Sequence, residues 1–134
     1  MLDRIDLHID VPTLNARELT QLETAEASAH IRLRVLCARQ RQLRRFAGRP
    51  ALYANAHLGP REVREFCHID EKSTALLRTA VQKLGLSARA YHRVLRLART
   101  IADLNDRDTI CAAHIAEAIQ YRSFDRQPPV FNDR

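Results

Sequence analysis

The sequence predicts an all-α fold in which a helical bundle follows one β-strand segment and a long basic helix. Two observations predict this fold. From about residue 24 onward, apolar residues recur at spacings of three and four, which is the period of an amphipathic helix. Alternation of apolar and polar residues, the pattern of a half-buried strand, occurs once, near the N-terminus. The 134 residues, 46% apolar and 28% charged, suffice for one soluble domain with a modest core.

The alternating segment covers residues 2–11. Apolar residues alternate there with aspartates and a histidine, and Pro12 ends the pattern. The apolar positions are Ile5, Leu7, Ile9 and Val11. A strand without neighbours leaves its backbone groups unpaired, and no second strand pattern follows. We therefore expect an orphan strand whose sheet lies elsewhere, so that the chain is the C-terminal piece of a larger protein.

A long helix is predicted over residues 24–47, which contain neither Gly nor Pro, and Gly48 and Pro50 end it. One stripe at helical spacing is expected to face the core: Ile31, Val35, Ala38, Gln42 and Phe46. Seven arginines, projected at about 100° per residue, surround this helix as a collar rather than forming one stripe. They are Arg32, Arg34, Arg39, Arg41, Arg44, Arg45 and Arg49.

Four shorter helices are predicted next, at residues 61–67, 71–84, 88–104 and 111–122. Pro60 is typical of a first helical position and opens the first of them. Asp70 and Ser87 are N-cap residues of the next two, and Gly85 ends the second as a left-handed C-cap. The tail after Ser123 has no period, and we expect it to be disordered.

The helix at residues 88–104 has the clearest apolar period of the chain. Its inward stripe is Tyr91, Val94, Leu95, Ala98, Ile101 and Ala102, and its four arginines, Arg89, Arg93, Arg96 and Arg99, lie off that stripe. The inward faces expected for the other short helices are Val63 and Phe66; Ser73, Leu76, Leu77, Ala80 and Leu84; and Ile115, Ala118 and Ile119. These faces together predict one shared core.

The charge balance is strongly basic. The net charge is +6, and of 22 basic residues only Lys72 and Lys83 are lysines. Arginine grips phosphates with its planar fork, so one interpretation is a nucleic-acid or nucleotide partner. The other interpretation is that the arginine usage reflects a GC-rich genome. If the collar binds nucleic acid, the candidate contacts are Arg34, Arg41, Arg44 and Arg45.

Several classes of site are excluded or disfavoured. The three glycines do not form a phosphate-binding loop, so the chain cannot hold a nucleotide in that way. The Cys and His residues do not form the two close pairs that a structural zinc site needs, and we expect no bound metal. No serine lies in a nucleophile elbow. The N-terminus lacks a signal peptide and no segment is a membrane span, so we expect a cytoplasmic protein without membrane contact. Three widely spaced cysteines fit a reducing compartment.

Several motifs resemble one family in order and spacing. They are Leu-Asp-Arg-Ile-Asp-Leu-His-Ile-Asp-Val-Pro at residues 2–12, Leu-Ser-Ala-Arg-Ala-Tyr at 86–91, Arg-Thr-Ile-Ala-Asp-Leu at 99–104 and Ile-Ala-Glu-Ala-Ile-Gln-Tyr-Arg at 115–122. The chain resembles the C-terminal part of the magnesium-chelatase-like AAA+ ATPases of bacteria, also called the YifB or ComM family. The similarity covers residues 2–126, whereas the family's Walker A and Walker B segments are absent from this sequence.

The resemblance implies a role for two arginines that would otherwise pass as solvated surface residues. It implies that Arg4 is an arginine finger, in a stretch similar to the Ser-Arg-Phe-Asp stretch of minichromosome-maintenance helicases, with Ile5 in place of the aromatic residue. It implies that Arg89 is the sensor-2 arginine of a helical lid. Residues 1–22 would then end the AAA+ core, residues 23–126 would form the C-terminal helical domain, and residues 127–134 a disordered tail.

The resemblance also implies a function for the parent protein: a hexameric ATPase that uses ATP and magnesium to drive DNA branch migration in natural transformation. The partners of this chain would be the AAA+ core of its own and neighbouring subunits, with DNA as a further partner. The fragment itself would need no cofactor and would not be an enzyme. The alternative hypothesis is a stand-alone basic helical module that binds nucleic acid non-specifically. An orphan strand favours the lid, because an independent binding module would not begin with one.

Overall fold

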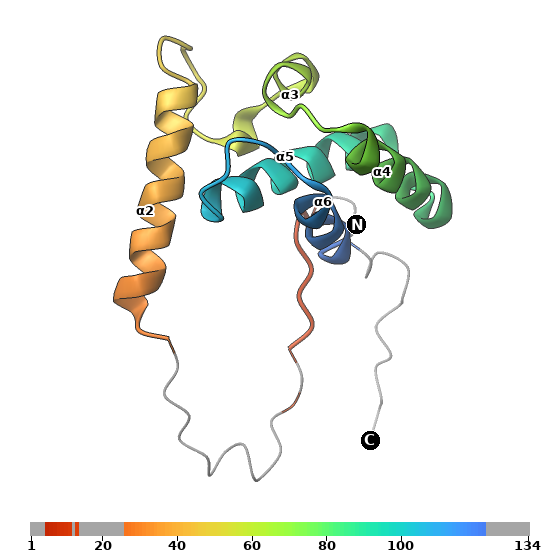
Figure 1. Ribbon diagram of the computed structural model, residues 1–134, viewed down its shortest axis with the longest axis horizontal. Coiled ribbons are helices and arrows are strands. Elements are labelled where there is room, and N and C mark those ends of the chain that lie inside the picture. Colours follow the sequence, from red (N-terminus) through yellow and green to blue (C-terminus); the bar gives the residue numbers. More distant parts are fainter. Residues whose placement is uncertain (1–4, 12, 14–25, 123–134) are drawn as a thin grey trace.

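The computed structural model describes residues 5–11, 13 and 26–122. Every regular element in these residues is a helix (Figure 1). The elements are α2 (Ser28–Arg45), the short 3-10 helix η2 (Asn55–His57), α3 (Pro60–Phe66), α4 (Glu71–Leu84), α5 (Ala88–Leu104) and α6 (Ala112–Gln120). The predicted all-α class is therefore confirmed for the described part of the chain.

The strand predicted at residues 2–11 is not formed in the part of it that the structure describes, residues 5–11. Residues 5–11 have no strand assignment and run as an irregular segment whose apolar side chains are largely exposed. A strand is stable only beside another strand, and none is present among the described residues. One backbone contact holds the segment near the end of α6: the His8 N–H donates a hydrogen bond to the Tyr121 carbonyl oxygen at 2.9 Å.

Helix α5 is the centre of the bundle, and α2, α3, α6 and η2 all contact it. It occupies residues 88–104 as predicted, and the Ser87 hydroxyl oxygen caps it by accepting a hydrogen bond from the Ala90 N–H at 3.2 Å. Most of its predicted stripe is buried: Val94, Leu95, Ala98, Ile101 and Ala102. One arginine departs from the pattern, because Arg99 is only 3% exposed.

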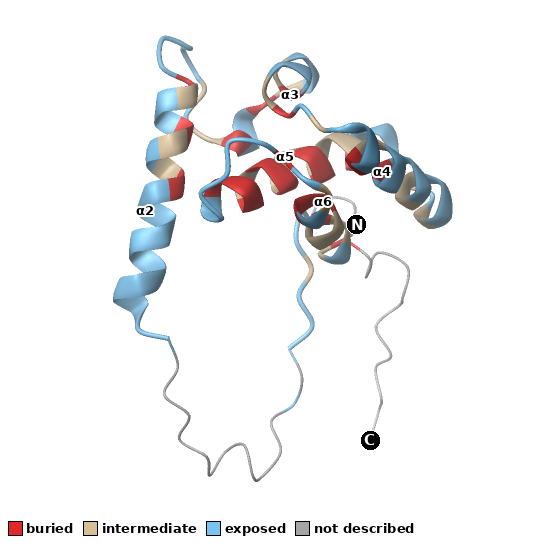
Figure 2. Ribbon diagram, in the orientation of Figure 1, coloured by how far each residue is buried: buried red, intermediate tan, exposed pale blue. Residues whose placement is uncertain are grey.

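Helix α2 packs on α5 with its C-terminal half only, and its N-terminal half projects away from the bundle (Figure 1, Figure 2). The predicted inward stripe divides at the same point. Ala38, Gln42 and Phe46 are buried, whereas Ile31 and Val35 are 43% and 45% exposed. The prediction of a core-facing stripe was therefore wrong for its first two turns, because a helical period shows which residues share a face and not how far the packing partner extends.

Helix α4 begins and ends where its capping residues predict, whereas α3 is shifted by one residue from the predicted 61–67 and α6 is shorter than the predicted 111–122. Asp70 accepts a hydrogen bond from the Ser73 N–H at 2.7 Å at the start of α4, and Gly85 ends α4 with φ of 57°. Leu77 is buried in the core, but Leu76 is 36% exposed and was wrongly assigned to the inward face. One isolated β-bridge within the described residues, between Ile69 and Ile110, joins the loops before α4 and α6.

Candidate functional site

Arg89 lies in the first turn of α5 with its side chain exposed. It forms no ion pair or side-chain hydrogen bond with any residue that the structure describes, and the first turn of α5 contains no acidic residue. A positive charge at a helix N-terminus opposes the helix dipole and slightly destabilises the helix. The same turn attracts an anion, because the free N–H groups and the guanidinium both carry positive charge there. Arg89 is therefore suited to a negatively charged ligand.

Arg4 lies outside the described residues, but the segment that follows it is placed against α5. Oδ1 of Asp6 lies 3.2 Å from Nε of Arg93, and Leu7 lines a small pocket together with Leu97 of the same helix. Arg89 and Arg93 are four residues apart on α5 and so occupy one side of it, one turn apart. The structure thus brings the segment after Arg4 to within a helical turn of Arg89.

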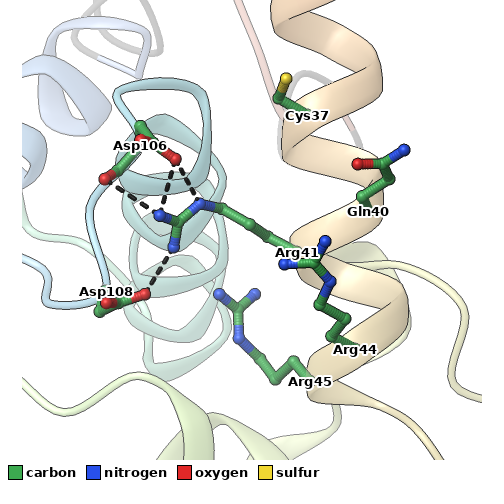
Figure 3. A pocket seen from close by; sticks show the side chains of 7 residues that line it. All are labelled: Cys37, Gln40, Arg41, Arg44, Arg45, Asp106 and Asp108. Atoms are coloured by element: carbon green, nitrogen blue, oxygen red, sulfur yellow. Dashed lines mark hydrogen bonds and ion pairs between the residues drawn. The ribbon is translucent and has the colours of Figure 1, made fainter.

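Of the collar arginines, Arg41 is held by two aspartates in the loop after α5 (Figure 3). Its Nε donates a hydrogen bond to Oδ1 of Asp106 at 2.8 Å, and its Nη1 pairs with Asp108. The hydrogen bond to Asp106, followed by that to Asp108, raises the pKa of the Arg41 guanidinium. Arg34, on the projecting half of α2, pairs with Glu26 at 2.9 Å on the surface.

Arg45 turns inward to a buried polar cluster. Its Nη1 donates hydrogen bonds to Oδ2 of Asp103 at 2.8 Å and to Oδ1 of Asn55 at 3.0 Å, and its Nη2 pairs with the other carboxylate oxygen. The Asp103 side chain is 0% exposed and also lies 3.2 Å from Nη2 of Arg99. A buried carboxylate is tolerated when charged partners and hydrogen bonds satisfy it. The cluster therefore fastens α2 and η2 to α5.

Arg99 completes this cluster on the side of the loop that follows α5. Its guanidinium donates hydrogen bonds to the carbonyl oxygens of Arg107 and Asp108, both at 2.6 Å. Burial lowers its pKa, an effect that Asp103 partly offsets. Arg99 therefore serves the fold, by tying the loop to the helix.

Arg44 differs from its neighbours in the collar. It is exposed and forms no ion pair with the described residues. It borders a cleft of about 690 Å³ between α2 and the loop after α5, which is lined by Cys37, Gln40, Arg41, Arg44, Arg45, Asp106 and Asp108 (Figure 3). Two of the cleft's three arginines are already paired with aspartates, so Arg44 is the member of this set best placed to meet an external phosphate.

The described cysteine and histidine side chains that are buried serve the fold. Cys67 is buried, and burial raises the pKa of its thiol to about 11, so the thiol stays protonated near neutrality. His114 accepts a hydrogen bond from the Cys111 N–H at 3.1 Å at the start of α6, and burial lowers its pKa. Within the described residues, no group of three His, Cys, Asp or Glu side chains could hold a metal ion. No helix of that part of the chain is long and apolar enough to span a membrane.

Sequence reasoning missed the buried cluster and the contact between Asp6 and Arg93. A signal for the first was present, because Arg99 and Asp103 have the i,i+4 spacing at which side chains on a helix meet. The second had no local signal, since the two residues lie far apart in the sequence.

Comparison with known proteins places this helical bundle among the C-terminal domains of the magnesium chelatase type. A family model described as magnesium chelatase, subunit ChlI C-terminal, matches residues 25–122, and the chain belongs to this family.

Comparison with individual proteins gives the same family. The chain is 43% identical to competence protein ComM of Haemophilus influenzae and 38% identical to the protein YifB of Escherichia coli K12, each over 126 residues. It is 30% identical to the protein Rv2897c of Mycobacterium tuberculosis over 123 residues. These alignments cover 91–93% of the chain but only 24% of each relative. The chain thus spans about a quarter of the length of these relatives.

Proposed function

We propose that the chain is the C-terminal helical lid of a hexameric AAA+ ATPase resembling ComM, in which ATP hydrolysis drives DNA branch migration during natural transformation. In this proposal residues 1–22 end the AAA+ core, residues 23–126 form the lid and residues 127–134 are a tail. The core of the same and neighbouring subunits binds ATP and magnesium in the cytoplasm. The lid contributes Arg4 as arginine finger and Arg89 as sensor 2.

The observation that carries the proposal is the environment of Arg89. Its guanidinium is exposed at the N-terminus of α5 without an ion pair to the described residues, and the segment after Arg4 lies one helical turn away, at Arg93. During phosphoryl transfer, negative charge is spread over the equatorial oxygens of the γ-phosphate. A preorganised guanidinium at that place stabilises the transition state by several kcal/mol. An arginine with no other counterion is available for this task.

The alternative, a stand-alone nucleic-acid module, receives less support from the geometry. Arg34, Arg41 and Arg45 are each engaged with an acidic side chain, which leaves Arg44 as the candidate of this set without an ion pair among the described residues. Breaking a partly buried pair to bind a phosphate would cost a large part of the binding energy. These contacts favour a collar that mainly supports the fold.

The test uses the full-length ATPase that carries this segment. Arg4→Ala should lower ATP turnover by about 10³, the lower end of what arginine fingers supply. Arg89→Ala should also lower turnover, and the double variant should lose less than the sum of the two, because both residues act on one transition state. Stability should change by no more than about 0.5 kcal/mol, as for ordinary surface substitutions. Arg→Lys should not rescue either position, because a point charge cannot reproduce the planar fork.

The matched control is Arg78→Ala, an exposed arginine of α4, which should hydrolyse ATP normally. Mixing Arg4→Ala subunits with subunits defective in Walker A distinguishes the direction of action, because restored activity requires that the finger reach a neighbour's nucleotide. The chain of 134 residues alone should show no turnover, since it lacks a phosphate-binding loop. Full ATPase activity in Arg4→Ala would contradict the finger assignment.

A further inference from the structure

Besides the hydrogen bond from the His8 N–H to Tyr121, one exposed carboxylate and two arginines attach the segment after Arg4 to the bundle. Oδ1 of Asp6 lies 3.2 Å from Nε of Arg93 in α5 and 4.0 Å from Nη1 of Arg122, which follows α6. Nη1 of Arg122 also donates a hydrogen bond to the Ile5 carbonyl oxygen at 3.4 Å. Asp6 therefore joins the segment to α5 and to the turn that follows α6.

Apolar packing contributes little to this attachment. Ile5, Leu7 and Ile9 remain 49%, 46% and 70% exposed, so much of their apolar surface stays in water. The stabilisation from burial scales with the area removed from water, which is small here. The charged and hydrogen-bonded contacts must therefore hold the segment in place.

The side chains of the two arginines are largely shielded from water. The Arg122 side chain is 1% exposed and that of Arg93 is 16% exposed, whereas Asp6 is 62% exposed. A guanidinium in such a dry position is costly unless a carboxylate lies nearby. Asp6 supplies one to both arginines, and the exposed carboxylate loses little hydration in doing so.

We propose that Asp6, Arg93 and Arg122 form a latch that fixes the segment carrying Arg4 to the helix carrying Arg89, so that Asp6 is a positioning residue for the finger. The positioning role of Asp6 rests on the proposed function, in which Arg4 is the arginine finger. Asp6 lies two residues after Arg4, and Arg93 lies one helical turn after Arg89. The latch ties the residues that follow Arg4 to the helix that carries Arg89, so that a movement of the lid carries this segment with it.

The first experiment tests the latch itself, on the chain of 134 residues, by amide hydrogen exchange. The reporter is the His8 N–H, which is bonded to the Tyr121 carbonyl oxygen. Asp6→Asn should reduce its protection by about tenfold or more, because the segment opens locally, while the amides of Val94 and Ala98 in the core keep theirs. Asp10→Asn removes a carboxylate of the same segment that forms no ion pair or hydrogen bond with the described residues, and should leave the protection of the His8 amide unchanged. Unchanged protection in Asp6→Asn would overturn the latch.

The second experiment tests positioning, in the full-length ATPase. Asp6→Asn should lower kcat by about 10- to 100-fold with little change in KM for ATP, since misplacing a catalytic group affects the transition state. Asp6→Glu, which keeps the carboxylate, should recover most of this loss. If Arg4→Ala loses turnover but Asp6→Asn retains it, the positioning role is wrong. Full turnover in Arg4→Ala would instead contradict the proposed function, while the exchange experiment decides on the latch separately.

Discussion

The two ends of α5 carry arginines in opposite surroundings. Near the C-terminal end, Arg99 is 3% exposed, and the two terminal nitrogens of its guanidinium are paired with Asp103 and two backbone carbonyl oxygens. In the first turn, Arg89 is exposed and has no ion-pair partner in the described part of the chain. The residue type is the same and both lie off the apolar stripe, so the difference lies in what the fold supplies as a counterion.

This difference separates arginines that hold the bundle together from arginines that remain available to a ligand. A buried guanidinium with its own carboxylate is costly to disturb, and its charge is already neutralised. An exposed guanidinium without a carboxylate partner keeps its full positive charge for a ligand, and it can change its position without breaking an ion pair. The number of arginines thus says little about function. Whether each arginine has an acidic partner separates those that stabilise the fold from those that can bind a ligand.

The largest expected effect comes from removing the buried carboxylate at the structural end. Asp103→Asn keeps the shape of the side chain but leaves Arg45 and Arg99 without it. We expect the free energy of unfolding in urea to fall by about 3–5 kcal/mol, the usual result of breaking a buried ion pair. Asp106→Asn is the control, because Asp106 is 83% exposed and its φ of 56° suits Asn. The control should cost less than about 1 kcal/mol. Equal losses in the two variants would contradict the distinction.

Two neighbouring residues of α2 sharpen the same comparison. Arg45 binds Asp103 and Asn55, whereas Arg44 is exposed without an ion pair in the described structure. Arg45→Ala should lower the unfolding free energy by about 2 kcal/mol, as expected for hydrogen bonds to a charged group. Arg44→Ala should change it by no more than about 0.5 kcal/mol. Thermal unfolding of both variants measures the difference, and a stability loss confined to Arg44→Ala would invert our interpretation.

The fold was largely predictable because its signals are local. Asp70, Ser87 and Gly85 cap helices with contacts between residues that are close in sequence, so their positions could be read directly. The stripe of α5 was also reliable, because a helix in the centre of a bundle is covered along its whole length. The apolar stripe of α2 predicted the correct face of the helix. How many of its residues are buried depends on how far α5 extends along α2, which the helical period does not reveal.

The candidate site was less predictable because it depends on contacts between distant residues. Arg89 was singled out by resemblance, and its exposure and lack of an ion pair became visible only in the structure. Asp6 and Arg93 are 3.2 Å apart but separated by most of the chain. The predicted strand failed for a related reason, since a strand is a property of a pair of segments and its partner is not in the described residues.

The Cys67 thiol is a probe of how far water is excluded around Arg99, Asp103 and Arg45. Burial raises its pKa from 9.0 to about 11, although the charges of Arg99 and Arg45 act in the opposite direction. The folded protein therefore retains this proton at a pH where the unfolded chain loses it, so stability is lost as pH rises above about 9. By pH 10 the loss should reach about 1 kcal/mol. Unfolding free energies measured from pH 8 to 10 should fall more steeply in the wild type than in Cys67→Ala. Parallel curves would mean that the cluster is wetter than the structure indicates.

The smallest expected effect concerns DNA. If α2 meets DNA within the proposed assembly, binding to duplex DNA should be independent of sequence, and log K should fall linearly with log salt because each phosphate contact releases counterions. Arg44 can neutralise a phosphate, whereas Arg41 is already neutralised by Asp106 and Asp108. Arg44→Gln should therefore reduce the magnitude of the salt slope by about one, and Arg41→Gln by clearly less. Fluorescence anisotropy with a labelled duplex measures both slopes. Equal reductions would mean that DNA displaces the aspartates from Arg41. Affinity that does not depend on salt would mean that none of the collar arginines contacts a DNA phosphate.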